Sequence, residues 1–387
     1  MMKNFVFYNP TKIVFGEGTV AQLKDLIPTR ARVLITYGGS SAEKTGTLAE
    51  VRRALQGYVV HEFGGIEPNP EYETLMRAVE VARKEEIDFL LAVGGGSVLD
   101  GTKFIAAAAR YEGGPWEIMK TRGAAIVEDA IPMGTVLTLP ATGSEMNSGA
   151  VITRRELKVK SAFFHASVFP KFSILDPTKT YSLPLRQVAN GVVDSFVHIT
   201  EQYLTYPADG MVQDKFAEGM LQILVDIGPG LLRKPDDYEA RANFMWVATW
   251  ALNGMIGAGV PQDWATHMIG HELTALFGMD HAQTLAVVLP SLLEEMREDK
   301  KDKLLQYAKN VWGITEGSDE EKVSLAIGKT RAFFEGMGVK TRLSDYGVTP
   351  EQAQEVVAQL QAHGMVALGE HGHITPEVSS AILRRCF

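Results

Sequence analysis

Five side chains that can bind a metal ion are grouped in the second half of the sequence. Asp194 and His198 are four residues apart, and His267 and His271 repeat this spacing. Because residues four apart lie on the same face of a helix, each pair presents both side chains in one direction. His281 follows shortly after, where a glycine separates two helical patterns.

These five residues are set among apolar neighbours, in segments such as VANGVVDSFVHITEQY and QDWATHMIGHELTALFG. A lone helical histidine is usually packed or solvated, but several polar groups in apolar surroundings need partners, because each one left without a partner costs several kcal/mol. A divalent metal would supply that partner, and imidazoles with one carboxylate suit Fe(II) or Zn(II). The only cysteine is Cys386, which argues against a structural zinc site built from thiolates. Spacing alone does not choose between His267 and His271.

Three turns in the first half of the chain have features of a dinucleotide site. The first, GGGS at 94–97, follows an apolar run and precedes a helical pattern that contains Asp100. Glycines there allow backbone N–H groups and the helix N-terminus to approach a phosphate. A plain tight turn is the alternative, and the pattern is not the G-x-G-x-x-G fingerprint.

The other two turns carry hydroxyl groups. In TLPATGSE at 138–145, the threonine hydroxyls can bond diphosphate or ribose oxygens, although a helix N-cap is the simpler interpretation of Thr142 or Ser144 alone. The turn GGSS at 38–41 lacks the acid that NAD-selective sites often place against the ribose 2′-OH, and Lys44 follows it. This turn therefore favours a 2′-phosphate, and NADP(H) over NAD(H).

Two kinds of scaffold must position these groups. Up to about residue 183, apolar runs at 33–37, 59–63, 89–93 and 135–139 alternate with helical patterns, and a strand pair is expected within 1–15. This alternation predicts a parallel sheet covered on both faces. Later residues show long helical patterns, at 186–203, 211–227, 238–255, 264–277 and 282–295, with about three more to the end. We therefore expect an α/β domain over 1–183, an all-α domain over 184–387, and a ligand-binding cleft between them.

The composition suits an ordinary two-domain globular protein. The chain has 387 residues, of which 45% are hydrophobic and 22% charged. Its net charge of -9 disfavours nucleic acid as a partner. The N-terminus lacks a signal-peptide core, and we find no apolar stretch of about 18 residues that would span a membrane. We therefore expect a cytoplasmic protein with no membrane partner.

Taken together, several motifs resemble the iron-containing, or group III, alcohol dehydrogenases. They are GGGSVLDGTK, TLPATGSE, the pair Asp194 and His198, and HxxxHELTAxxGxxHAxTLAxxLP at 267–290. GGIEPNP at 64–70, NGVVD at 190–194 and the segment 259–275 are most similar to the family's butanol dehydrogenase and NADPH-dependent aldehyde reductase branch. The resemblance covers nearly the whole chain and implies a dehydroquinate synthase-like architecture, with a dinucleotide-binding α/β domain, a helical metal-binding domain and a homodimer.

The resemblance also assigns roles to residues. It gives the metal ligands as Asp194, His198, His267 and His281, and it moves His271 to a place beside the substrate. It implies cofactor contacts along Gly38, Gly39, Ser40, Gly95, Gly96, Ser97, Asp100, Thr138, Thr142 and Lys160. The implied activity is hydride transfer between NADP(H) and an alcohol/aldehyde pair, favouring reduction of short- to medium-chain aldehydes. The metal, Fe2+ or Zn2+, would act as a Lewis acid on the substrate oxygen, while His271 relays a proton or only positions the substrate.

Two rival interpretations remain at this point. A glycerol dehydrogenase or a dehydroquinate synthase, which is a lyase, would share the glycine turns but lay out its metal ligands differently. A non-catalytic nucleotide- or metal-binding protein would bind metal and NADPH without oxidising NADPH when an aldehyde is added.

Overall fold

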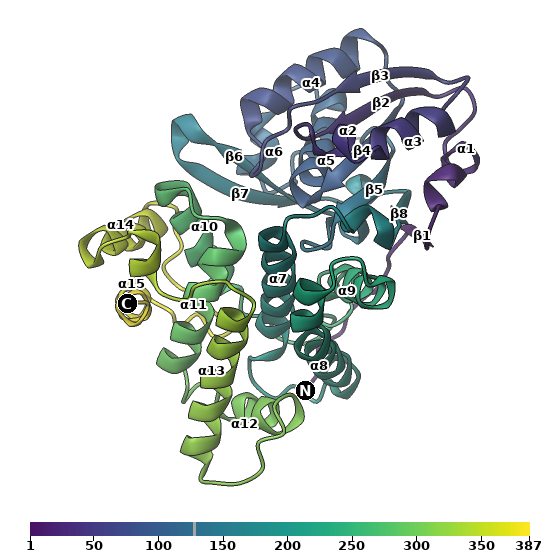
Figure 1. The fold of residues 1–387 in the computed structure, drawn as a ribbon. Helices are drawn as coiled ribbons and strands as arrows, with labels where there is room; N and C mark the ends of the chain where they lie inside the picture. Colours follow the sequence, from purple (N-terminus) through teal and green to yellow (C-terminus); the bar gives the residue numbers. More distant parts are fainter. Residues whose placement is uncertain (127–128) are drawn as a thin grey trace. The chain divides into compact units, whose positions relative to one another are not determined.

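The computed structural model describes residues 1–126 and 129–387, which form two compact units (Figure 1). The sheet unit consists of Tyr8–Leu183 and Pro235–Asn253, and the helical unit consists of Met1–Phe7, Pro184–Lys234 and Gly254–Phe387. Helix α9 (Tyr238–Ala251), which its sequence pattern groups with the later helices, therefore belongs to the sheet unit.

The sheet unit is built on a six-stranded sheet in the order β1-β8-β5-β4-β2-β3, and every neighbouring pair is parallel. This confirms the predicted parallel sheet. The strands are β1 (Lys12–Phe15), β2 (Arg32–Tyr37), β3 (Val59–Phe63), β4 (Phe89–Gly95), β5 (Met133–Leu139) and β8 (Phe172–Leu175).

The apolar runs form central strands because the sheet is covered on both faces. Along β4, Leu90 and Ala92 pack in one hydrophobic cluster, whereas Leu91 and Val93 pack in another. Successive side chains of a strand point to opposite faces, so each face has its own core. Helices α4 (Tyr72–Lys84) and α5 (Gly96–Arg110) contribute to the first cluster, and α1 (Leu23–Leu26) and α3 (Thr47–Ala54) contribute to the second. The sheet unit also contains α2 (Ser41–Lys44) and α6 (Trp116–Lys120).

The strand pair expected within residues 1–15 is wrong in its first half. Only Lys12–Phe15 forms a strand there, and it pairs with β8 from much later in the unit. The sequence patterns also missed β8 and an antiparallel hairpin of β6 (Gly149–Arg154) and β7 (Val159–Phe164). Strand β8 has only four residues, and β6 and β7 are defined by their pairing with each other.

The helical unit confirms the long helical patterns. Its helices are α7 (Leu185–Tyr203), α8 (Met211–Arg233), α10 (Ala265–Phe277), α11 (His281–Glu295), α12 (Lys301–Asn310), α13 (Asp319–Gly336), α14 (Pro350–Ala362) and α15 (Pro376–Arg385). Helix α8 continues beyond the predicted end at 227 and includes Pro229.

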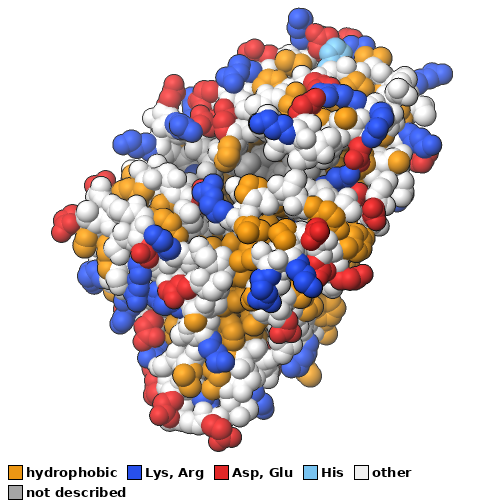
Figure 2. Space-filling model, viewed as in Figure 1, with side chains coloured by type: hydrophobic (Ala, Val, Ile, Leu, Met, Phe, Trp, Pro, Cys, Tyr) orange, Lys and Arg blue, Asp and Glu red, His pale blue; other side chains and the backbone are white. Residues whose placement is uncertain are grey.

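The surface shows mixed charge. On the face shown in Figure 2, basic and acidic side chains are interspersed rather than gathered into one large basic patch. Within the described ranges, no helix has both the length and the apolar character needed to cross a bilayer.

Candidate functional site

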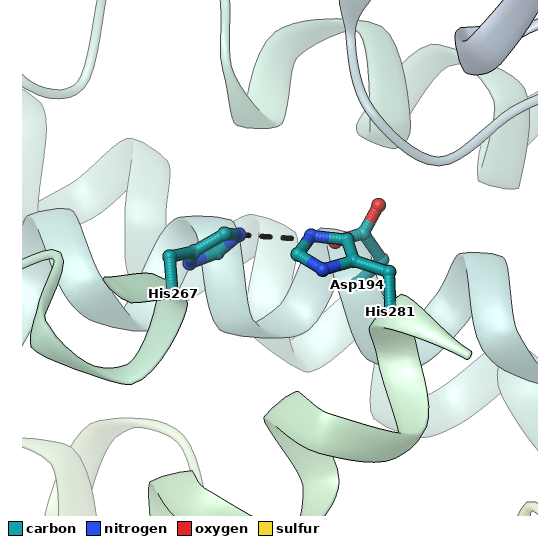
Figure 3. A group of neighbouring side chains, drawn as sticks. All are labelled: Asp194, His267 and His281. Atoms are coloured by element: carbon teal, nitrogen blue, oxygen red, sulfur yellow. Dashed lines mark ion pairs between the residues drawn. The ribbon is translucent and has the colours of Figure 1, made fainter. Parts of the chain in front are cut away.

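Three helices of the helical unit bring metal-binding side chains to one point. Asp194 lies within α7, His267 in the first turn of α10, and His281 at the first position of α11. Figure 3 shows these three side chains converging, and their ligand atoms all lie within 4.8 Å of one another. Asp194 and His267 are buried and His281 is partly exposed.

The distances around Asp194 suit a shared cation better than direct hydrogen bonds. Its Oδ1 atom lies 3.6 Å from Nε2 of His198, 4.0 Å from Nε2 of His267 and 3.6 Å from Nε2 of His281. Two ligand atoms bound tetrahedrally to one ion at its usual bond length would be roughly 3.4 Å apart. Asp194 Oδ1 is also enclosed and accepts no hydrogen bond from the residues that the structure describes. One carboxylate surrounded by imidazole Nε2 atoms therefore fits a divalent transition metal.

The other two candidate ligands, His198 and His271, have rings in contact with the rings of this group. The His198 ring stacks on the His267 ring, with centroids 4.7 Å apart and planes 15° apart. The His271 ring is buried, 5.4 Å from the His281 ring and 6.2 Å from the His267 ring between centroids. The structure thus brings together all five residues singled out by spacing.

The position of His281 is fixed by the residue before it. Asp280 is the N-cap of α11 and forms a capping box with Gln283, so the helix begins at a defined residue. Asp280 Oδ2 also accepts hydrogen bonds from Arg186 Nη1 at 2.8 Å and Asn190 Nδ2 at 3.1 Å. Both donors belong to α7, and Asn190 lies one turn before Asp194. These contacts set the position of the N-terminus of α11 relative to the Asp194 carboxylate.

Glu201, which no sequence motif indicated, is a buried carboxylate beside this group. Glu201 Oε2 is hydrogen-bonded to His267 Nδ1, and Glu201 Oε1 accepts the backbone N–H of Thr266 at 2.7 Å. Burial and nearby Asp263 raise the pKa of the Glu201 carboxyl, while the N–H donors of α10 oppose this rise. The signal was available in the spacing, since Glu201 continues the helix face of Asp194 and His198 at the next turn.

The turn that leads into α10 adopts an unusual backbone conformation. Trp264 precedes the helix with φ of 68°, in the left-handed region that side-chain-bearing residues rarely occupy. Its ring contacts the His267 ring edge-on at 5.3 Å, and its indole N–H donates to Gln262 Oε1 at 2.8 Å. Such strain persists only where the surroundings over-determine it, and here it lies directly beside the histidine cluster.

In the sheet unit, two glycine-containing turns pack directly on each other. A Cβ at Gly96 would lie 2.4 Å from Thr142 Oγ1, and a Cβ at Gly95 would lie 2.9 Å from Leu139 Cβ. Only glycine therefore allows the turn after β4 to approach the turn after β5. Helix α5 begins at Gly96 with no side-chain cap, which leaves its first N–H groups available for a phosphate.

Asp100, in α5, links this helix to the turn after β5 and to strand β6. Its Oδ1 accepts the Ser144 hydroxyl at 2.6 Å, and its Oδ2 accepts the backbone N–H of Val151 at 2.9 Å. Burial raises the pKa of Asp100, and nearby Lys103 opposes that rise. These bonds give Asp100 a structural role in addition to its expected place near the pyrophosphate.

Asn69 is a second residue that the sequence analysis missed. Its backbone N–H donates to Ser97 Oγ at 3.3 Å, and its Oδ1 accepts a hydrogen bond from Lys160 Nζ at 2.9 Å. Its φ of 56° is left-handed, which asparagine tolerates better than most residues. Asn69 thus joins two of the predicted cofactor residues.

The remaining predicted cofactor residues lie at the ends of neighbouring strands. Gly38 follows β2, and a Cβ there would be 3.5 Å from Val98 of α5, so this turn is adjacent to the first. Gly39 and Ser40 are exposed, and Thr138 is half-buried at the end of β5. The carboxyl ends of β2, β4 and β5 therefore carry all three turns at one edge of the sheet, where ligands bind in open α/β sheets.

Comparisons with known proteins match both units. Residues 10–177 match the family described as iron-containing alcohol dehydrogenase, and residues 188–386 match the C-terminal part of the Fe-containing alcohol dehydrogenase family. The NADPH-dependent aldehyde reductase YqhD of Escherichia coli (strain K12) is 60% identical over 383 residues, covering 98% of this chain and 99% of that protein. The probable NADH-dependent butanol dehydrogenase 1 of Bacillus subtilis (strain 168) is 39% identical over 388 residues, covering 99% of each.

The fold agrees with the same relationship. A crystal structure of YqhD from E. coli K-12 has a TM-score of 0.98 to this structure at 59% identity, covering 100% of this chain and 99% of that chain. The butanol dehydrogenase A of Thermotoga maritima has a TM-score of 0.95 at 36% identity, covering 100% of this chain and 99% of that chain. The chain is an oxidoreductase that belongs to the iron-containing alcohol dehydrogenase family.

Proposed function

We propose that this protein reduces short- to medium-chain aldehydes with NADPH, and that it oxidises the corresponding alcohols in reverse. The observation that carries the proposal is the convergence of imidazole Nε2 atoms on Asp194 Oδ1, within 4.0 Å. The NADPH-dependent aldehyde reductase that is 60% identical to this chain supports the choice of substrate and cofactor.

The metal would be held by Asp194, His198, His267 and His281, all within the helical unit. A bound Fe2+ or Zn2+ would act as a Lewis acid that polarises the aldehyde carbonyl. Asp194 would supply negative charge that offsets the charge of the metal, and the histidines would bind it as neutral imidazoles. His271 lies beside these residues and is our candidate for passing a proton between the substrate oxygen and solvent.

NADP(H) would bind along the three turns of the sheet unit. Gly95, Gly96 and Ser97 would receive the pyrophosphate at the N-terminus of α5, and Gly38, Gly39 and Ser40 would receive the adenosine ribose. No carboxylate occurs within 38–42, so this turn lacks the acidic partner that NAD-selective sites often offer to a free ribose 2′-OH. The name of the Bacillus relative includes NADH dependence, so initial rates with NADPH and with NADH test the proposed preference.

Two further parts of the proposal concern organisation. We assign cofactor binding to residues 1–183 and metal binding to 184–387, in a cytoplasmic homodimer. The exposed side chains of Phe5, Val6 and Tyr8 support association near the N-terminus. Light scattering during size-exclusion chromatography measures the mass directly, and a monomer at micromolar concentration would contradict the dimer.

The decisive experiment combines metal analysis with a panel of aldehydes. We expect about one divalent ion per chain and faster oxidation of NADPH than of NADH. The variant His281→Ala should lose both the metal and the activity. If the purified protein reduces aldehydes at the same rate without any metal, or if metal and NADPH produce no aldehyde-dependent turnover, the proposal is wrong.

A further inference from the structure

We propose that Glu201 is a positioning residue that fixes His267 as a metal ligand through Nε2 and thereby sets how tightly the protein retains its metal. The inference rests on the metal site proposed above, but it concerns a residue outside the ligand set. Glu201 is 2% exposed and lies on α7, one turn beyond His198.

The contacts of Glu201 select one form of the His267 ring. A neutral imidazole carries a proton on one nitrogen and a lone pair on the other. An ionised Glu201 can only accept a hydrogen bond, so its Oε2 contact with His267 Nδ1 places the proton on Nδ1 and the lone pair on Nε2. Nε2 is the His267 atom that lies 4.0 Å from Asp194 Oδ1, on the side where the other imidazoles converge. The hydrogen bond therefore fixes both the tautomer and the direction of the ring.

Glu201 itself is held by the start of α10. Its Oε1 accepts the N–H of Thr266 at 2.7 Å and that of His267 at 3.4 Å. Asp263 Oδ1 accepts the N–H of Ala265 at 2.9 Å, so two carboxylates occupy the first three N–H groups of the helix. These groups otherwise lack partners and carry partial positive charge, which favours an anion at this place.

Asp263 and Lys300 make further contacts that hold Glu201 and the start of α10 in place. The N–H of Asp263 donates to the backbone oxygen of Glu201 at 2.8 Å. Lys300, which is 1% exposed, places its ammonium group 3.0 Å from Asp263 Oδ2. The left-handed Trp264 lies within this arrangement, between Asp263 and the first residue of α10. Glu201 therefore cannot turn away from His267 without breaking contacts along the whole beginning of α10.

Helix α10, which carries His267, also provides a matched control residue. Glu272 is also buried, and its Oε1 is 2.7 Å from Nδ1 of His363, so it forms a second carboxylate–imidazole pair. His363 is the C-cap of α14 and is not one of the five clustered residues. Replacing Glu272 removes a similar buried charge and hydrogen bond without touching the His267 ring.

The test uses the full-length protein and Zn(II) as the probe. In Glu201→Gln, a single carbonyl oxygen must serve donors that now share two oxygens, and the new NH2 group faces N–H groups. We expect Glu201→Gln to bind Zn(II) about 10- to 100-fold more weakly in competition with a chromophoric chelator. Glu272→Gln should bind Zn(II) like the wild type. If Glu201→Gln keeps wild-type affinity and dissociation rate, the proposal is overturned.

Two further measurements separate the possible failures. If Asp194→Ala binds Zn(II) as well as the wild type, the proposed metal site is wrong, whereas wild-type binding by Glu201→Gln alone refutes only the role of Glu201. If Glu201→Gln does not fold, NMR of the histidine ring nitrogens in the wild type answers the question. His267, assigned by comparison with His267→Asn, should carry its proton on Nδ1, and a proton on Nε2 in the metal-free protein would overturn the proposal.

Discussion

The turn at Gly96 offers a sharp test of how the cofactor site is built. In a Gly96→Ala variant, the new Cβ would lie 2.4 Å from Thr142 Oγ1, 2.5 Å from Cγ2 and 3.0 Å from Cβ. Rotation of Thr142 does not relieve this contact. Its two branches occupy two of three staggered positions, so at least one of the two clashing positions is always filled. The backbone of one turn must therefore shift.

Such overpacking typically costs about 1–3 kcal/mol. We expect the free energy of unfolding to fall by that amount in denaturant titrations. Because α5 begins at Gly96, the same shift displaces the N–H groups proposed to bind the pyrophosphate. A loss of that size in binding corresponds to roughly 5- to 150-fold weaker binding of NADPH, measured by fluorescence titration.

A second glycine gives the control. Gly328 is an exposed residue inside α13, and a Cβ there meets no atom within 4 Å. Gly328→Ala should therefore raise stability by up to about 1 kcal/mol through helix propensity and leave NADPH binding unchanged. Adding Thr142→Ala to Gly96→Ala should recover most of the lost stability, since both clashing atoms disappear. If Gly96→Ala behaves like Gly328→Ala, the steric reasoning is refuted.

Three other predictions follow from the two units. Burial lowers the pKa of Lys103 from 10.5 to about 8, so the unfolded chain binds more protons than the folded one between these values, and stability should rise with pH in this window. Across this window, the free energy of unfolding of the wild type should rise by about 3 kcal/mol relative to that of Lys103→Met in denaturant titrations. A difference between the two proteins that does not vary with pH would contradict the prediction. Removing the metal with a chelator should abolish aldehyde reduction but leave the affinity for NADPH nearly unchanged, because the proposed cofactor residues belong to the sheet unit; a parallel loss of both would count against separate sites. His271→Ala should lower kcat about 100-fold if His271 transfers the proton, and full turnover with an unaltered pH profile would remove that role.

Much of the fold follows from local patterns. The apolar run at 89–93 is bounded by glycines and is short, which is typical of a central parallel strand, and β4 forms there. The helical periodicity after residue 183 predicts α7 and α10 within about one residue of their observed ends. Local patterns fail for β8 and for the partner of β1, because their pairing joins distant parts of the chain.

The candidate residues show the same division. Spacing identified Asp194, His198, His267, His271 and His281 as residues on shared helix faces. It did not single out Asn69, or Glu201 on the same helix face as Asp194 and His198, because a glutamate in a helix and an asparagine before proline are ordinary in sequence. Their importance depends on what lies across from them, His267 for Glu201 and Lys160 for Asn69.

The side chains that share a face of each helix can be read from the sequence alone, because they depend only on the helical repeat. The sequence also determined where glycine permits a turn to come close to a ligand. The convergence of three separate helices at Asp194 Oδ1 and the hydrogen bond from His267 Nδ1 to Glu201 depend on how distant helices pack. The relation between two helices is set by the packing and capping contacts between them, and no local repeat in the sequence encodes those contacts.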